Sequence, residues 1–87
     1  MESEVKAGID RFRDACEKIL PGIVLVVPVK PTQGAFLVSF SHEGFRTYGT
    51  IKEDDFADWG EFSDHPEMLK MAGQCVRKLL DGKAGHA

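Results

Sequence analysis

The side chains that most often carry catalysis are few in this sequence and stand far apart. The three histidines fall beside a predicted turn, at a predicted helix start and in the C-terminal tail; they are His42, His65 and His86. No Ser-His-Asp arrangement, HExxH spacing or nucleophile-elbow motif occurs. We therefore expect the histidines to be exposed polar residues. The sequence predicts no catalytic residue and a protein that is not an enzyme.

A dense group of carboxylates in residues 53–67 raises the question of a metal site. A calcium loop needs oxygen ligands at its first, third and fifth positions and glycine at its sixth. Counted from Asp55, glycine does fall at the sixth position, as Gly60, but Ala57 and Trp59 stand where oxygen ligands are needed. The chain also contains no CxxC pair for zinc and no glycine-rich phosphate loop. We expect no metal and no cofactor.

The two cysteines, Cys16 and Cys75, fall on the apolar sides of two different predicted helices. Free cysteine is commonly buried and unreactive, so both are expected to be small core residues. A disulfide would require the helices to bring them within bridging distance, and a reducing compartment would disfavour it.

Length and charge narrow the class of protein further. Eighty-seven residues allow one small domain, residues 1–87, and are too few for a doubly wound nucleotide-binding fold or a barrel enzyme. The net charge of −3 is unevenly spread: residues 53–67 hold seven acids and no lysine or arginine, so the rest, with eleven bases and seven acids, carries +4. Such asymmetry can mark a partner surface.

Nothing in the sequence points to a membrane or to secretion. The start, Met1-Glu2-Ser3-Glu4, is acidic where a signal peptide would be basic, and no apolar run approaches the ~20 residues of a membrane span. We expect a cytoplasmic protein without membrane contact.

Two amphipathic helices are expected at the ends of the chain, over about residues 3–20 and 65–81. The first has an apolar stripe of Val5, Ile9, Phe12, Cys16 and Ile19, and the last has one of Leu69, Ala72, Val76, Leu79 and Leu80. Asp64 and Glu67 have the spacing of a capping box at the start of the last helix. Residues 83–87 are expected to form a frayed tail.

Three strands are expected between the helices, over about residues 23–30, 35–41 and 45–51. Pro28 lacks the N–H that a central strand donates, so the first strand belongs at a sheet edge, with Pro28 pointing away from its neighbour. This leaves residues 45–51 as the edge more open to strand addition. In the first strand we expect the following residues to face the helices: Ile23, Leu25, Val27 and Val29.

Hydrophobic matching selects a two-residue turn, Glu43-Gly44, between the second and third strands, because a slip of one residue would turn every side chain over. This register pairs His42 with Phe45 and Phe36 with Ile51. It gathers the following residues on the inner face: Phe36, Val38, Phe40, Phe45 and Ile51. The opposite face then carries Leu37, Ser39, Ser41, Arg46, Tyr48 and Thr50.

The expected fold class is α+β, with the order α-β-β-β-α and an antiparallel three-stranded meander that packs two helices on one face. Residues 53–63 are read as an acidic, aromatic linker that could form a short helical turn. The predicted core is formed by Phe12, Phe36, Val38, Phe40, Leu69 and Val76.

The functional hypothesis comes from the outer face of the sheet. Val24, Val26, Pro28, Leu37 and Tyr48 would lie there, and contiguous apolar surface seldom stays bare on a monomer. We expect a protein-interaction module, either a homodimer or bound to a protein partner. The candidate interface residues are Leu37, Arg46, Tyr48, Phe56, Trp59 and Phe62. Alternatively, the three aromatic residues of the linker fold back and cover the face from within.

Two other functions stay open as alternatives. The element order is shared with double-stranded-RNA-binding domains, but the second helix of that family begins with lysines. Here the corresponding segment reads Asp64-His65-Pro66-Glu67, which would repel phosphates and disfavours nucleic acid as a partner. The second alternative is an acidic inhibitor or mimic that uses residues 53–67.

Overall fold

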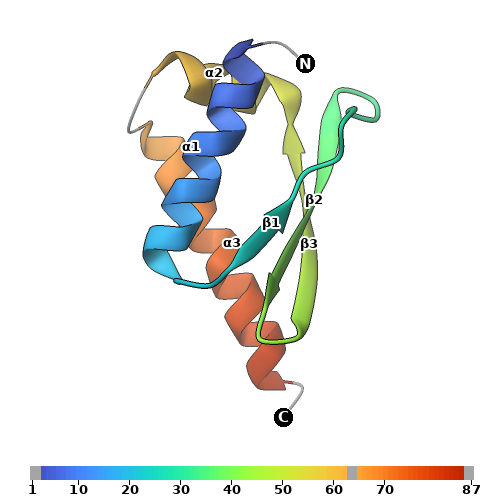
Figure 1. The fold of residues 1–87 in the computed structure, drawn as a ribbon, viewed down its shortest axis with the longest axis vertical. Helices are drawn as coiled ribbons and strands as arrows, with labels where there is room; N and C mark the ends of the chain where they lie inside the picture. The colour runs from blue at the N-terminus through green and yellow to red at the C-terminus, as the bar shows by residue number, and fades with distance from the viewer. Residues whose placement is uncertain (1–2, 63–64, 86–87) are drawn as a thin grey trace.

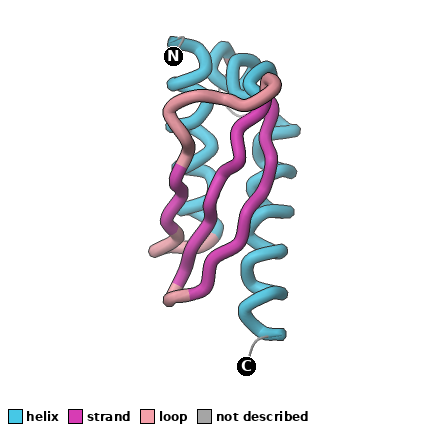
Figure 2. The backbone as a smooth tube through the Cα atoms, turned by 90° about the vertical axis from the view of Figure 1, so that its right-hand side faces the viewer, coloured by secondary structure: helices cyan, strands magenta, loops and turns pink. Residues whose placement is uncertain are grey.

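The structure is a computed structural model that describes residues 3–62 and 65–85 (Figure 1). Its longest strands, β2 (Ala35–His42) and β3 (Phe45–Lys52), form a hairpin. The other elements are α1 (Ser3–Ile19), β1 (Val24–Val26), α2 (Glu53–Glu61) and α3 (Pro66–Gly85). The strands form one antiparallel sheet in the order β1-β2-β3, and the helices lie on one side of it (Figure 2). The α+β class and the three-stranded meander are thus confirmed.

The predicted register of the hairpin is also confirmed. His42 pairs with Phe45, Phe40 with Thr47 and Phe36 with Ile51. Glu43 and Gly44 both have positive φ, 49° and 85°, as the tight turn with two central residues requires. The register therefore follows from one turn and from the burial of one face.

The first strand is shorter than expected: it ends at Val26, not near residue 30. In the ladder Val26 lies opposite Ser39. Hydrogen-bonded pairs recur at every second residue, so the next such pair after Val26–Ser39 would be Pro28–Leu37. There the strand has to donate an N–H to β2, which proline cannot do. Pro28 therefore does not point away from its neighbour as expected; it ends the strand. Val29, expected to face the helices, is exposed.

The segment expected to be a linker forms a third helix, α2, which begins directly after β3. Its first turn holds three acidic residues, a charge that a helix N-terminus favours. At its other end, Arg11 of α1 donates from Nη1 to the carbonyl oxygens of Trp59 and Gly60, at 2.8 Å each. These bonds satisfy carbonyl groups that the end of a helix leaves without partners.

The core lies between the inner face of the sheet and the helices. Phe12, Phe36, Val38, Phe40 and Val76 are buried as predicted, but Leu69 is not, because 48% of it is exposed. The buried stripe of α3 is Met68, Ala72, Val76 and Leu79. Gly82, near the C-terminal end of the same side of the helix, lies against the ring of Phe45.

Side chains of His65 and Lys83 form hydrogen bonds near the two ends of α3. Asp64 of the proposed capping box lies outside the described residues; at this end His65 Nδ1 accepts the N–H of Glu67 at 3.2 Å. At the other end the helix continues to Gly85. Residues 83–85 are therefore not frayed; Lys83 donates from Nζ to Glu43 Oε2 at 2.7 Å, which fastens this end to the hairpin turn.

Candidate protein interface

The outer face of the sheet lies on the side away from the helices (Figure 2). The ladder arranges its side chains in rows across the strands. Val24, Ser41 and Arg46 form the row nearest the hairpin turn. Val26, Ser39 and Tyr48 form the next row. Leu37 and Thr50 form a third. The face is therefore a regular surface whose neighbours are fixed by register.

The apolar side chains of this face are adjacent to one another. Val26 and Tyr48 flank Ser39 from either side, and Leu37 is the next outward residue along the same strand. Each is about half exposed: 56% of Val26, 57% of Leu37 and 50% of Tyr48. With Val24, also exposed, they form an apolar patch that we call the outer patch: Val24, Val26, Leu37 and Tyr48.

The charges on the outer face are all positive and stand at its ends. Arg46 lies in the row beside the hairpin turn, and Lys52, opposite Ala35, lies at the far end of β3. Of the outward residues of the three strands, no other is charged. The acidic residues of α2 begin beyond the far end of β3, so the length of the strand separates them from Arg46. Arg46 is left exposed at the rim of the outer patch.

A hollow of about 490 Å³ continues the face at the hairpin end. It is lined by Gly22, Val24, Ser41, His42, Glu43, Gly44 and Arg46. Hydrogen bonding to Lys83, and the charge of that lysine, lower the pKa of Glu43. His42, expected to be exposed, has only 12% of its side chain exposed, and its Nδ1 lies 3.4 Å from Lys83 Nζ. Of the other two, His65 is only partly exposed and His86 lies outside the described residues.

The prediction of an interface position is wrong for two of the six residues. Phe56 and Trp59 are fully buried on the helix side. There Trp59 stacks on Phe12 with 5.3 Å between the ring centroids, and Phe56 packs edge to face on Phe36 with 5.6 Å between the centroids. Buried there, they are not exposed to a partner and do not cover the outer face from within. Phe62 is exposed, but it follows α2 and does not belong to the sheet. The structure therefore brings together only Leu37, Arg46 and Tyr48 of the six candidates.

The thiols are not activated for chemistry. Cys16 is buried as expected, and burial is the main reason that its pKa is raised to about 12. Burial likewise raises the pKa of Cys75, which is only partly buried, and the two thiols are free. Thiols with raised pKa values are protonated at neutral pH and are poor nucleophiles. Within residues 3–62 and 65–85, no group of three or more potential metal ligands comes together.

One residue that acts at the sheet was missed from the sequence. Lys78 of α3 donates from Nζ to the backbone carbonyl of Tyr48 at 2.8 Å. No local sequence pattern predicts this contact, since it depends on how α3 packs beside β3. Lys52, in contrast, could have been placed on the outer face by extending the predicted register by one residue.

Compared with known proteins, the chain matches no family model, no curated protein and no solved structure. Among the helices that the structure describes, none has the length and apolar character needed to cross a bilayer.

Proposed function

We propose that this protein is a protein-interaction module that associates with a second copy of itself through the outer patch. The observation that carries the proposal is the adjacency of Val26, Leu37 and Tyr48, each about half exposed on a face away from the helices. Apolar side chains gathered in this way are typical of binding surfaces. Tyr48 is the expected anchor, because a large amphipathic ring gives contact area at low entropic cost.

The charge distribution supports a second copy as the occupant. The centre of the outer face is uncharged, so two copies can place their outer patches opposite each other without burying a charge. Arg46 and Lys52 stand at the two ends and remain in water at the rim, where charges influence association rate and orientation more than affinity. A two-fold arrangement of identical patches closes on itself and gives a dimer.

The size of the outer face sets the expected affinity of the dimer. Two strands of eight residues span ~27 Å each and β1 spans ~10 Å, which together give a face of about 300 Å² per copy. A standard specific interface buries about 800 Å² per partner, so the dimer should be weak, with a dissociation constant of about 1–100 μM. A cytoplasmic location belongs to the same proposal, and the free thiols Cys16 and Cys75 are compatible with a reducing compartment. No catalytic role is assigned.

The test is sedimentation of the full chain between about 0.5 and 500 μM, a range that brackets the expected dissociation constant. The wild type should shift from monomer to dimer, and Leu37→Ser and Tyr48→Ser should each weaken the dimer about tenfold or more. Leu69→Ser is the matched control, because Leu69 is comparably exposed but lies on α3. A wild type that stays monomeric throughout, or a loss of dimer in Leu69→Ser alone, contradicts the proposal.

Salt separates this function from the alternatives. An apolar interface holds or tightens as ionic strength rises, whereas contacts with phosphates weaken steeply. Binding to a heparin column that salt abolishes, without self-association, would favour nucleic acid over a second copy. A salt-sensitive complex with a basic protein that depends on Asp54 and Asp58 would favour the acidic mimic.

A further inference from the structure

The sheet has two edges at which another chain could add a strand. The order β1-β2-β3 leaves one side of β1 and one side of β3 without a neighbouring strand. The N–H and C=O groups of such an edge are a template for pairing with another strand. A chain that pairs through the face of its sheet and leaves an edge open can also grow into open-ended assemblies.

The open backbone groups of β3 can be assigned from the ladder. His42 and Phe45 flank a two-residue turn, so they form a hydrogen-bonded pair. Alternation along the strand then directs the backbone groups of Arg46, Tyr48 and Thr50 away from β2. Tyr48 is the middle one of the three. Its carbonyl is therefore the acceptor at the centre of the edge that an added strand would use.

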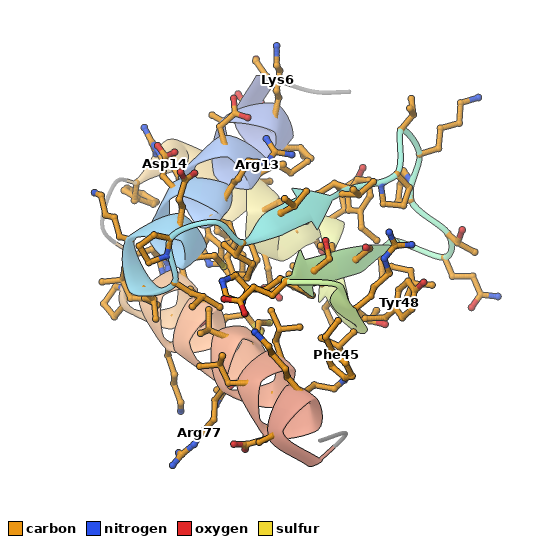
Figure 3. The ribbon with its side chains drawn as sticks, turned by 60° about the horizontal axis from the view of Figure 1, so that its bottom comes forward. Lys6, Arg13, Asp14, Phe45, Tyr48 and Arg77 are labelled. Atoms are coloured by element: carbon orange, nitrogen blue, oxygen red, sulfur yellow. The ribbon has the colours of Figure 1, made fainter. Side chains whose placement is uncertain are left out.

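The Tyr48 carbonyl already accepts a hydrogen bond from Lys78. Lys78 Nζ donates to the Tyr48 carbonyl oxygen at 2.8 Å, across 30 residues of sequence. The bond comes from α3, which runs beside β3 and approaches it closely one turn later, where a β-carbon on Gly82 would lie 2.9 Å from the ring of Phe45. The preceding residue, Arg77, points away from the sheet (Figure 3). The position in the helix, and not merely the presence of a base, brings Lys78 to the edge.

A bound lysine at this place opposes strand addition in two ways. An incoming strand would need its own N–H on the Tyr48 carbonyl, so it would have to displace the ammonium group. The displaced ammonium would then lie beside a newly buried edge, and lysine at a sheet edge is a common means of preventing such pairing. The β1 edge is short, because β1 is three residues long and Pro28 follows it closely.

We infer that α3 closes the β3 edge through Lys78, so that this protein receives a partner on the face of its sheet and not along its edge. The expectation from the sequence, that residues 45–51 form the edge more open to strand addition, takes no account of α3. The inference deepens the proposed function and rests on it for the statement that the face is the receiving surface. The closure of the edge depends only on the Lys78–Tyr48 contact.

The test compares Lys78→Met with Arg77→Met in the full chain. Both changes replace an exposed base on α3 by an unbranched apolar side chain, and only the first removes the donor to Tyr48. We expect Lys78→Met to form assemblies larger than a dimer, with amide exchange at Arg46, Tyr48 and Thr50 slowed about tenfold in concentrated samples. Arg77→Met should behave as the wild type. A Lys78→Met protein with wild-type assembly and exchange overturns the inference.

A combined variant separates this inference from the proposed function. Lys78→Met with Leu37→Ser should still gain protection along β3, although its outer patch is impaired. If the wild type is monomeric and Lys78→Met nevertheless gains edge protection, the proposed dimer is wrong and the closure of the edge stands. If the wild type dimerises and Lys78→Met changes neither assembly nor exchange, the closure of the edge is wrong and the proposed dimer stands. Emission from Trp59, which is buried, reports in every variant that the fold is intact.

Discussion

Gly8 of α1 lies directly against the backbone carbonyl of Phe56 in α2, with no space between them for a side chain. A second contact of the same kind joins Gly60 of α2 to the carbonyl of Glu4. The two glycines let the helices meet backbone to backbone. This approach places Trp59 in the core.

The closeness of these helices predicts that Gly8→Ala destabilises the protein by about 1–3 kcal/mol, as overpacking does, even though alanine favours a helix. Gly73→Ala is the control, because a β-carbon at this position of α3 meets nothing within 4 Å. It should instead stabilise the fold by about 0.5–1 kcal/mol. Urea unfolding followed by Trp59 fluorescence measures both. Equal effects of the two changes would contradict the packing described.

Arg11 should matter more than its exposed neighbours. Arg11→Met keeps much of the side-chain volume but leaves the carbonyls of Trp59 and Gly60 without their donor, which should cost about 1–3 kcal/mol. Arg13→Met is the comparison, because Arg13 pairs with Asp10 at 3.2 Å on an exposed surface, and it should cost less than about 0.5 kcal/mol. If both variants unfold at the same urea concentration, Arg11 does not support α2.

Phe40 tests the inner face of the sheet. Its ring is buried and meets Phe12 edge to face at 6.3 Å. Phe40→Ala should therefore lower the free energy of unfolding by about 3–5 kcal/mol, a large share of the stability of a small domain. Ser39→Ala, on the opposite face of the same strand, should change it by less than about 0.5 kcal/mol. A loss under about 1 kcal/mol in Phe40→Ala would show that this face is not the core.

Glu43 predicts a pH dependence. Because Lys83 lowers the pKa of Glu43 in the folded protein, the folded carboxylate binds a proton less readily than the unfolded one. Its contribution to stability is therefore present above the unfolded pKa and is lost as pH falls through the folded one. Glu43→Gln should remove that part of the stability loss between about pH 5 and pH 3, and high salt should weaken the difference. Identical pH profiles for the variant and the wild type would contradict the Glu43–Lys83 pairing.

Local rules were sufficient for the hairpin of β2 and β3. The Glu43-Gly44 turn has only one register that buries the apolar residues of both strands, so the pairing of Phe36 with Ile51 followed from sequence. Pro28 was correctly read as marking an edge strand. Where the strand ends was missed, because that depends on which backbone groups face β2.

The helix layer could not be read in the same way. Leu69 and Met68 both fit the apolar period of α3, and only the packing of the helix on the sheet decides that Met68 is the buried one. Trp59 was expected at an interface, or folded back on the outer face of the sheet, because residues 53–63 were read as a linker. Contact between α1 and α2 at Gly8 and Gly60, which no periodicity reveals, places it in the core.

Whether two copies meet at the outer patch is tested by diluting isotope-labelled protein from about 1 mM to about 10 μM, which covers the upper part of the expected range of dissociation constants. We predict amide shifts that depend on concentration and concentrate at Val24, Val26, Leu37, Ser39 and Tyr48. Spectra that do not change with concentration, or changes confined to the helices around Phe62 and Leu69, would contradict association through the outer patch.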